Sequence, residues 1–312
     1  MTDRPEKLML LDTASLYFRA FFGVPDSVTA PDGSPVNAVR GLLDFIARLV
    51  SDHRPTHLAC CWDNDWRPQW RVDLVPTYKL HRVVEAVPGG ADVEETPDPL
   101  QVQVPVIVEV LDALGLAIVG ADHHEADDVI GTLATGAGMP VDIVTGDRDL
   151  FQLVDDEQQV RVLYTARGMS NLDSIDAAAV RSRYGIQPGQ YADFATLRGD
   201  NSDGLPGVAG IGDKTAATLL QQFGDLEGVI AAASDLRTKL TPAQRKRIVA
   251  GADYLKVAPT VVAVVRDLDL DLPDLRLPAA VPAVPDAFES LVERWGLGRS
   301  AERVVAALSD VG

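Results

Sequence analysis

The sequence has few of the features that mark secreted or membrane-spanning chains. Its 312 residues include only 2 cysteines, Cys60 and Cys61, which are adjacent. Neighbouring side chains in a strand point to opposite faces, so these two are not expected to form a disulfide. No apolar run approaches the roughly 20 residues that cross a bilayer, and the polar N-terminus lacks a signal peptide. These absences predict a cytoplasmic protein with no membrane-spanning segment.

Basic residues are also scarce, and they are unevenly distributed. The chain has 46 acidic and 28 basic residues, a formal net charge of −18. Residues 1–82 hold 10 of each sign, 83–147 hold 13 acids without one Lys or Arg, and 148–312 hold 23 acids and 18 bases. A negative net charge usually argues against nucleic acid as a partner, because a protein that binds a polyanion needs a basic face. The acidic window therefore needs a local explanation.

The first half of the chain alternates short apolar runs with helical patterns. A chain of this length can bury about 75% of its unfolded surface, so a large core is expected. Strands are predicted at 8–11, 58–62, 116–119, 141–144 and 160–164, and helices at 39–50, 102–114 and 125–135. This order predicts an α/β fold in which helices cover both faces of a mostly parallel central sheet.

The second half changes in texture. From about residue 177 the pattern is helical with glycine-rich turns, followed by a β-rich stretch at 257–265 and a final helix that includes 288–295. Residues 83–100 carry Pro, Gly and five acids, which is typical of a mobile surface segment. We therefore expect an α/β core at 1–176 with a gateway at about 66–104, a helical subdomain at 177–256, and a C-terminal segment at 257–312 that packs back on the core.

Acidic residues fall where the predicted strands end, and one more pair follows later. The candidates are Asp12, Asp63, Glu125, Asp127, Asp128, Asp147, Asp149, Asp200 and Asp203. A lone Asp after a strand is most often a turn former or a helix cap. In parallel α/β sheets, however, the carboxyl ends of the strands meet at one edge, where ligands bind. So many carboxylates at one edge repel one another unless cations neutralise them.

The kind of ligand then indicates the kind of ion. Oxygen ligands without His or Cys partners favour Mg²⁺ or Mn²⁺ over Zn²⁺. Two such ions roughly 4 Å apart suit the in-line hydrolysis of a phosphodiester. The acids therefore predict a site for two divalent ions and phosphoryl chemistry.

A glycine-rich stretch at 205–217 has the form of a helix-hairpin-helix. Gly207, Gly210 and Gly212 allow tight turns and a close approach of the backbone to a phosphate. Lys214 and Thr215 add a charge and a hydroxyl at the start of the next helix. Such a loop contacts the nucleic-acid backbone rather than the bases. The alternative is a helix–helix turn that binds no ligand.

Basic and aromatic residues precede the acidic window. Lys79 and Arg82 are spaced to share a helical face, and Tyr78 is placed to stack on a terminal base. Arg71 and, more weakly, Arg19 are further candidates for phosphate contacts. A solvated basic surface is the alternative. The run Arg245-Lys246-Arg247 is either a solvated helix face or an extension of the duplex-binding track.

The order and spacing of these motifs resemble the bacterial 5′-nuclease family. This family comprises the N-terminal domain of DNA polymerase I and its free-standing relatives, and is related to flap endonucleases. The motifs that carry the resemblance are Glu125-Ala-Asp127-Asp128-Val, Thr145-Gly-Asp-Arg-Asp-Leu-Phe-Gln-Leu, Leu197-Arg-Gly-Asp-Asn-Ser-Asp203 and Leu205-Pro-Gly-Val-Ala-Gly-Ile-Gly-Asp-Lys-Thr-Ala. Together with Asp12, Asp63 and Tyr78-Lys79 they span residues 8–220.

The resemblance implies a SAF-like nuclease core with a helical arch over the active site. It assigns Asp12, Asp63, Glu125, Asp127 and Asp128 to a first metal site, and Asp147, Asp149, Asp200 and Asp203 to a second. Lys79 and Arg82 would clamp the scissile phosphate at the base of the arch. The hairpin at 210–215 would grip the duplex, and the resemblance allows a third divalent ion and a K⁺ ion at the hairpin carbonyls.

The expected function is that of a structure-specific 5′-nuclease, a 5′-3′ exonuclease and flap endonuclease of replication and repair. Its products would carry 5′-phosphate and 3′-hydroxyl ends. Its substrates would be DNA with 5′ flaps, nicks or 5′ ends, with RNA–DNA hybrids as a further substrate, and it would act as a monomer. A free-standing protein is favoured, and the alternative is a fragment of a longer polymerase. The alternatives are a non-catalytic structure-specific DNA-binding protein and an RNA-directed nuclease of similar shape.

Two departures from the family pattern stand out. Thr13 follows the first Asp where Gly is common. Residues 83–98 are acidic and rich in Pro and Gly where the family's arch often carries basic residues. The second departure bears on how a 5′ single strand would be captured.

Overall fold

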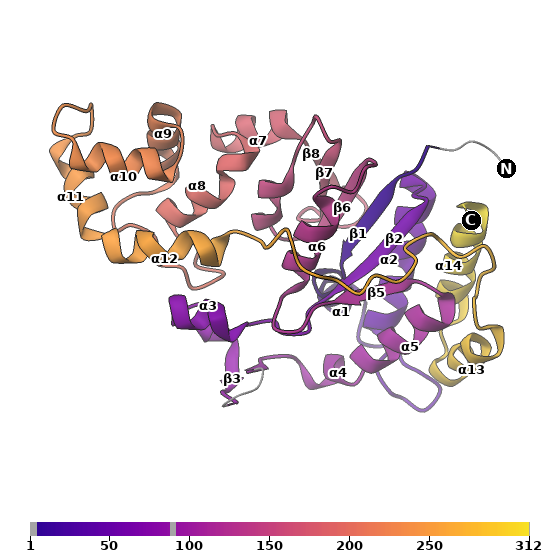
Figure 1. The fold of residues 1–312 in the computed structure, drawn as a ribbon. Helices are drawn as coiled ribbons and strands as arrows, with labels where there is room; N and C mark the ends of the chain where they lie inside the picture. The colour runs from indigo at the N-terminus through magenta and orange to yellow at the C-terminus, as the bar shows by residue number, and fades with distance from the viewer. Residues whose placement is uncertain (1–4, 88–91, 312) are drawn as a thin grey trace.

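The computed structural model describes residues 5–87 and 92–311 and has a six-stranded sheet at its centre (Figure 1). The strand order is β5-β2-β1-β6-β7-β8. The strands are β1 (Leu8–Asp12), β2 (His57–Trp62), β5 (Ala117–Gly120), β6 (Val141–Thr145), β7 (Val160–Tyr164) and β8 (Asp173–Ile175). All neighbours pair in parallel except β7 and β8, which are antiparallel. The α/β fold with a mostly parallel sheet is therefore confirmed.

Each face of the sheet packs against its own core. Along β1, Leu8 and Leu10 contact one cluster, whereas Met9 and Leu11 contact the other, as the period of two in a strand requires. One face is covered by α6 (Ala126–Ala134) and the short helix η2 (Asp149–Leu153). The other is covered by α1 (Thr13–Gly23), α2 (Asn37–His53) and α5 (Val104–Leu114). Cys60 and Cys61 are both free and buried, in opposite cores.

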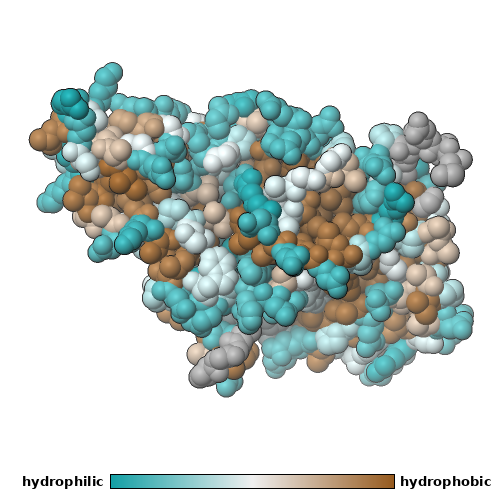
Figure 2. Space-filling view, viewed as in Figure 1, coloured by the Kyte–Doolittle hydropathy of each residue, from teal (hydrophilic) through white to brown (hydrophobic). Residues whose placement is uncertain are grey.

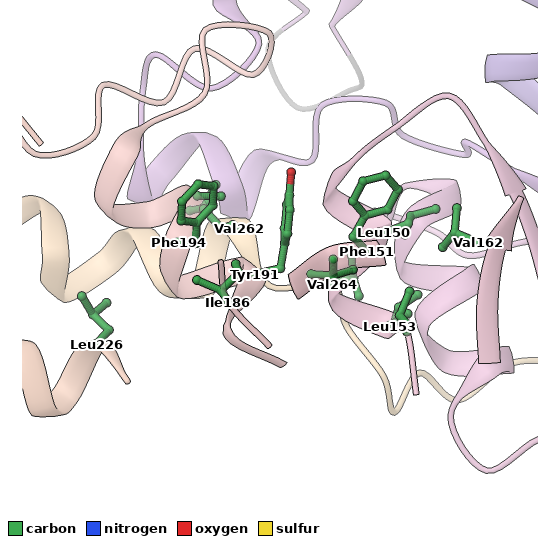
Figure 3. Packing of buried hydrophobic residues seen from close by; sticks show 14 of the residues in the cluster. Leu150, Phe151, Leu153, Val162, Ile186, Tyr191, Phe194, Leu226, Val262 and Val264 are labelled. Carbon is green, nitrogen blue, oxygen red and sulfur yellow. The ribbon is translucent and has the colours of Figure 1, made fainter. Parts of the chain in front are cut away.

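The chain after β8 forms a helical lobe on the side of the sheet away from α14 (Figure 1). Its elements are α7 (Ala177–Tyr184), η3 (Pro188–Gln190), α8 (Tyr191–Arg198), α9 (Asp213–Phe223), α10 (Leu226–Ser234), α11 (Pro242–Ala250) and α12 (Ala252–Val262). Phe151 of η2 packs edge-on against Tyr191 of α8, with ring centroids 5.7 Å apart. Figure 3 shows this junction, where Phe194, Val262 and Val264 also meet. The lobe and the sheet therefore share one continuous core.

Two expectations for the C-terminal part are wrong. Residues 257–262, predicted to be β-rich, belong to α12, with Pro259 inside the helix. Leu255, Ala258, Val261 and Val262 are buried on one face of α12, which packs on α8, so tertiary packing outweighs the β propensity of the valines. The helix at 288–295 is α13 (Pro285–Trp295), but it is not the last. It is followed by α14 (Gly298–Val311), which packs on α2, while α13 packs on α5.

The gateway at 66–104 is also different from the expected helical arch. It contains α3 (Gln69–Leu74), η1 (Leu80–Arg82) and α4 (Asp98–Gln101), which flank the antiparallel pair β3 (Val83–Glu85) and β4 (Val93–Glu94). In the described part of the gateway the centre is therefore a short antiparallel strand pair. Residues 88–91, in the segment predicted to be mobile, lie outside the described residues. In the parts of the chain that the structure covers, no helix is long and apolar enough to cross a membrane.

Candidate active site

A polar cleft of about 510 Å³ lies at the carboxyl edge of the sheet. Its carboxylates come from the ends of β1, β2 and β6, the start of α6 and the gateway strand β4. These residues are Asp12, Asp63, Asp147, Glu125, Asp127 and Glu94. Lys79, Arg82 and Arg148 also line it. The structure therefore brings most of the predicted acids and both predicted cations into one cavity.

Asp12 is held by two hydrogen bonds at the end of β1. One carboxylate oxygen accepts from the Ser15 amide at 3.1 Å, which caps α1, and the other accepts from the Thr145 hydroxyl at 2.6 Å. The same hydroxyl accepts from the Asp147 amide at 2.8 Å. Thr145, which sequence reasoning missed, therefore orients acids from two strands. The one feature of the sequence that could have indicated Thr145 is its position directly before Gly146-Asp147.

Burial and mutual repulsion hold several of these acids toward their protonated forms. Burial and the neighbouring charge of Asp63 raise the pKa of Asp12 to about 7. Burial, and then Asp147 and Asp12, raise the pKa of Asp127 well above its ordinary value. The pKa of Asp63 is also raised, chiefly by burial. Such crowded carboxylates favour binding of a cation, which would remove the repulsion.

A second group of acids lies on the η2 side of the cleft. Burial, Asp147 and Asp203 raise the pKa of Asp149 well above its ordinary value. The Asp149 Oδ1 atom is buried and has no hydrogen-bond partner among the described residues. Burial raises the pKa of Asp203 to about 6, although Lys79 opposes the shift. An orphaned carboxylate oxygen beside two other acids is a suitable donor set for a hard cation.

Glu125 connects the cleft to the base of the gateway. It is only 3% exposed, and its carboxylate accepts from the Tyr78 hydroxyl at 2.8 Å and from Lys79 Nζ at 2.7 Å. Burial raises the pKa of Glu125, but Lys79 and Arg71 outweigh that effect and lower it. Glu125 is therefore a buried anion that holds the Lys79 ammonium in the cleft.

Lys79 and Arg82 line the cleft, but they do not share a helical face. Lys79 has a left-handed backbone with φ 46°, and η1 begins one residue later. The Lys79 amide donates to the Asp203 carbonyl at 2.9 Å, and Arg82 donates to the Ser202 carbonyl at 2.7 Å. Gly204 permits this contact, because a Cβ there would lie 2.1 Å from the Thr77 carbonyl oxygen. Backbone contact with the 200–204 loop, rather than helical spacing, places both cations.

The structure contradicts three predicted roles. Asp128, expected to bind metal, is 0% exposed, and both of its oxygens accept from Arg71 at 2.7 and 2.9 Å. Arg71, expected to contact DNA, is 2% exposed because it is enclosed in this pair. Tyr78, expected to stack on a base, is 4% exposed and donates to Glu125. These residues stabilise the site from within the core and are not accessible to a ligand.

Asp200 lies beside the cleft with its carboxylate already bound by the protein. One oxygen accepts from the Ser202 amide at 2.9 Å and from the Ser202 hydroxyl, and the other accepts from Arg198 at 2.8 Å. Burial raises the pKa of Asp200, but Ser202 and Arg198 outweigh it and lower the pKa. Asp200 is thus a stable anion whose contacts shape the loop that carries Asp203.

The predicted hairpin lies between α8 and α9, and its glycines have different roles. Gly207 has φ 65° and contacts α8 so closely that a Cβ would lie 2.4 Å from the Gly199 nitrogen, so it is needed for packing. Gly210 and Gly212 are exposed, and their amides donate to no acceptor in the described chain. Lys214 is exposed in the first turn of α9, and Thr215 is half-buried. The free amides and Lys214 together form a surface suited to an anion.

Arg19 lies on α1 at the edge of the cleft. A Cβ on Gly146 would be 3.5 Å from Arg19 Nη2, so its guanidinium lies beside the loop that carries Asp147. Its Nε is buried and has no acceptor in the described chain. Its position is consistent with the predicted phosphate contact, which stays a prediction.

Several residues that line the cleft were not singled out from the sequence. They are Ser15, Phe18, Glu94, Arg148, Tyr164 and Ser202. Arg148 could have been found from its place between Asp147 and Asp149. Glu94 could not, because only the β3–β4 pairing turns it into the cleft, where burial raises its pKa. As placed, no three His, Cys, Asp or Glu side chains of the described residues form a ready cage for a metal ion.

The fold and the cleft define a class: α/β proteins with an acidic cleft at the carboxyl edge of a parallel sheet and a hairpin-bearing helical lobe. Two family models match the chain. One is the 5′-3′ exonuclease, N-terminal resolvase-like domain, at residues 7–185, and the other is the 5′-3′ exonuclease, C-terminal SAM fold, at residues 186–282. The chain belongs to the 5′-3′ exonuclease family.

Curated relatives support this membership. A 5′-3′ exonuclease of Streptomyces coelicolor is 61% identical over 301 residues, which cover 96% of this chain and 100% of that protein. A 5′-3′ exonuclease of Mycobacterium tuberculosis is 51% identical over 96% of this chain and 97% of that protein. DNA polymerase I of M. tuberculosis is 41% identical over 77% of this chain, but the match covers only 26% of the polymerase.

Solved structures share the fold at low identity. The T5 D15 protein co-crystallised with metal ions has a TM-score of 0.64 and 16% identity, over 98% of this chain and 99% of that chain. The catalytic core of Rad2 in complex with DNA substrate has a TM-score of 0.60 and 17% identity, over 97% and 95%. The sheet and the helical lobe are therefore arranged as in these two structures.

Proposed function

We propose that this protein is a structure-specific 5′-nuclease that hydrolyses phosphodiesters of DNA at 5′ flaps, nicks and 5′ ends. The observation that carries the proposal is the cleft itself, in which buried, mutually repelling carboxylates face Lys79 and Arg82. The names of the curated relatives support the same activity. The reaction would leave a 5′-phosphate and a 3′-hydroxyl, and the same chemistry would serve RNA–DNA hybrids. We expect the protein to act as a monomer.

The donor set of the cleft fits hard divalent cations such as Mg²⁺ or Mn²⁺. Asp12, Asp63, Glu125 and Asp127 would hold one ion, and Asp147, Asp149, Asp200 and Asp203 would hold the other. Several of these carboxylates are engaged by protein donors, so part of the coordination would pass through water or follow side-chain rotation. Bound divalent ions would supply activation of water and stabilisation of charge on the phosphate.

The remaining residues would bind and orient the substrate. Lys79 and Arg82 line the cleft together with the acids, and they would hold the scissile phosphate and offset the charge that develops on it. The free amides of Gly210 and Gly212 with Lys214 would bind a phosphate of the duplex in the helical lobe. Two separated phosphate sites, on a sheet and a lobe that share one continuous core, would align the duplex end with the cleft. A K⁺ ion at the hairpin and a third divalent ion stay predictions.

The experiment that tests this function uses a 5′-labelled flap duplex and an RNA of matched sequence. Each is incubated with the protein in Mg²⁺, in Mn²⁺ and in EDTA. Cleavage of the flap duplex in either metal but not in EDTA is the expected result. Binding without cleavage would indicate a structure-specific DNA-binding protein, and preferential cleavage of the RNA would indicate an RNA-directed nuclease.

Site variants connect the activity to the cleft. Asp147→Asn and Asp149→Asn should each remove most cleavage while the circular dichroism spectrum is unchanged. Asp26→Asn, at an exposed position that does not line the cleft, is the matched control and should cleave normally. Unchanged turnover in both cleft variants would refute the assignment of the two-metal site.

A further inference from the structure

The basic run on α11 has three different environments. Arg245 donates to the Ala232 carbonyl at 2.8 Å, to the Ala233 carbonyl at 2.5 Å and to the Thr238 hydroxyl at 3.1 Å. It therefore satisfies the orphan carbonyls at the end of α10 and has a structural role. The sequence left open whether this run is a solvated helix face, and the structure gives its three residues different surroundings.

Lys246 lies on a second side of α11. It lines an apolar groove together with Leu236 and Val249, which are 85% and 59% exposed. Figure 2 shows brown, apolar side chains at this end of the helical lobe. Lys246 is exposed, and among the described residues no hydrogen bond or ion pair joins its side chain to the hairpin. Lys246 therefore carries a positive charge on the same helix as Arg247, but at a different position.

Arg247 reaches across to the hairpin. Its Nη1 donates to the Gly210 carbonyl at 3.0 Å. The guanidinium lies close against the glycine, since a Cβ on Gly210 would be 2.9 Å from both Cζ and Nε. Arg247 is exposed, and within the described chain it pairs with no carboxylate. Its Nε and Nη2 donors therefore remain available to a ligand.

This contact fixes one peptide group of the hairpin at both ends. The Gly210 carbonyl accepts from Arg247, and the Ile211 amide on the same peptide donates to the Val208 carbonyl at 2.9 Å. The amides of Gly210 and Gly212 flank this peptide, and neither has an acceptor in the parts of the chain described. The side of Gly212 is open, because a Cβ there would meet nothing within 4 Å. A fixed peptide between two free amides is a preorganised anion site.

We propose that Arg247 completes the phosphate site of the hairpin. Its Nη1 positions the Gly210–Ile211 peptide. Its Nε and Nη2 bind the DNA phosphate that the Gly210 and Gly212 amides also hold. A planar guanidinium can serve both acceptors at once, whereas an ammonium is a single point charge. This inference rests on the proposed function, since the ligand is a phosphodiester of the duplex.

The test compares Arg247→Ala, Arg247→Lys and the matched control Lys246→Ala in equilibrium binding to a labelled duplex with a 5′ flap. Binding is measured in Ca²⁺ at four salt concentrations. Arg247→Ala should bind about tenfold more weakly, and its salt slope should fall by about 1, the loss of one phosphate contact. Arg247→Lys should keep the slope but lose part of the affinity. Lys246→Ala should match the wild type within about twofold, because its side chain makes no hydrogen bond to the hairpin.

A kinetic measurement separates positioning of the duplex from chemistry. At saturating flap duplex in Mg²⁺, Arg247→Ala should cleave at the wild-type rate, with the loss confined to KM. Equal effects of Arg247→Ala and Lys246→Ala on affinity and slope would overturn the proposal, because they would show only a loss of general charge. Arg247→Lys serves if the alanine variant unfolds, and its full wild-type affinity would also overturn it. A wild-type protein that neither binds nor cleaves the duplex would instead refute the proposed function.

Discussion

Replacing Arg71 tests whether the buried ion network under the cleft holds the fold together. Arg71 donates to Asp128 at 2.7 and 2.9 Å and to the Val261 carbonyl at 3.1 Å, and it lies 3.3 Å from Glu125. It therefore connects α3, the start of α6 and the end of α12. The variant Arg71→Met keeps the apolar stem and removes the charge. Asp128 would then be a buried carboxylate without its partner.

The size of the effect follows from that burial. Removing one partner of a buried ion pair costs about 3–5 kcal/mol, because the other charge is left unpaired in a medium of low polarity. For a protein of this size, 1 kcal/mol lowers the melting temperature by about 2 °C, so the expected loss is about 6–10 °C. The control is Arg48→Met, whose pair with Asp52 is 49% and 58% exposed and should contribute less than about 1 kcal/mol.

Two measurements on the same variants separate stability from DNA contact. Urea unfolding followed by circular dichroism gives the free energy of unfolding, and duplex binding is measured well below the transition. Arg71→Met should lose stability and, while folded, bind the duplex as the wild type does. Unchanged stability with tenfold weaker binding would refute the reasoning, since it would mean that Arg71 is exposed and contacts DNA.

Three further predictions concern other charged residues. Lys79→Ala should slow single-turnover cleavage by about 10²-fold while duplex affinity changes little, because its ammonium faces the acids of the cleft; the opposite pattern would make it a binding residue only. Lys214→Ala should lower the slope of log affinity against log salt by about 1, and an identical slope would remove the hairpin from the duplex site. Asp142 is a buried acid on the interior strand β6, near the amino end of that strand. Its partners are Lys7, His53 and Arg161. Burial raises the pKa of Asp142, but Arg161 and Lys7 outweigh burial and lower the pKa below its ordinary value of 3.8. The ionised Asp142 therefore stabilises the fold fully above pH 3.8. This stabilisation is lost as the pH falls through the lower pKa that Asp142 has in the folded protein. Asp142→Asn should therefore lower the melting temperature at pH 7 but narrow its difference from the wild type at pH 3; a constant difference would show that the ion pair contributes nothing.

The gateway shows a first limit of reasoning from sequence. Residues 83–98 are acidic, and their composition indicated only a mobile surface segment. The structure pairs β3 with β4, which places Glu94 in the cleft 4.0 Å from Arg82. Trp66 donates to the Asp92 carbonyl at 2.7 Å, and Arg67 pairs with the Asp92 side chain. Contacts between residues about 25 positions apart depend on the path of the chain, which composition does not contain.

The sequence by itself determined where the acids would meet. Strand ends in a parallel sheet lie at one edge, so Asp12, Asp63 and Asp147 had to converge once the order of strands and helices was recognised. The motifs also determined the family, because their spacing reflects that same order. These inferences depend only on local pattern and on the geometry common to all parallel α/β sheets.

Only the tertiary structure decided which member of each motif faces the cleft. Asp127 and Asp128 are adjacent on α6, and adjacent helical residues point about 100° apart. Asp127 therefore lines the cleft, whereas Asp128 points into the core toward Arg71. Arg71 precedes Asp128 by 57 residues, and no local pattern shows that they pair. Asp128 pairs with Arg71 in the core, whereas Asp127 faces the open cleft. Which of the two is buried depends on every element that packs around them, and only the tertiary structure shows this.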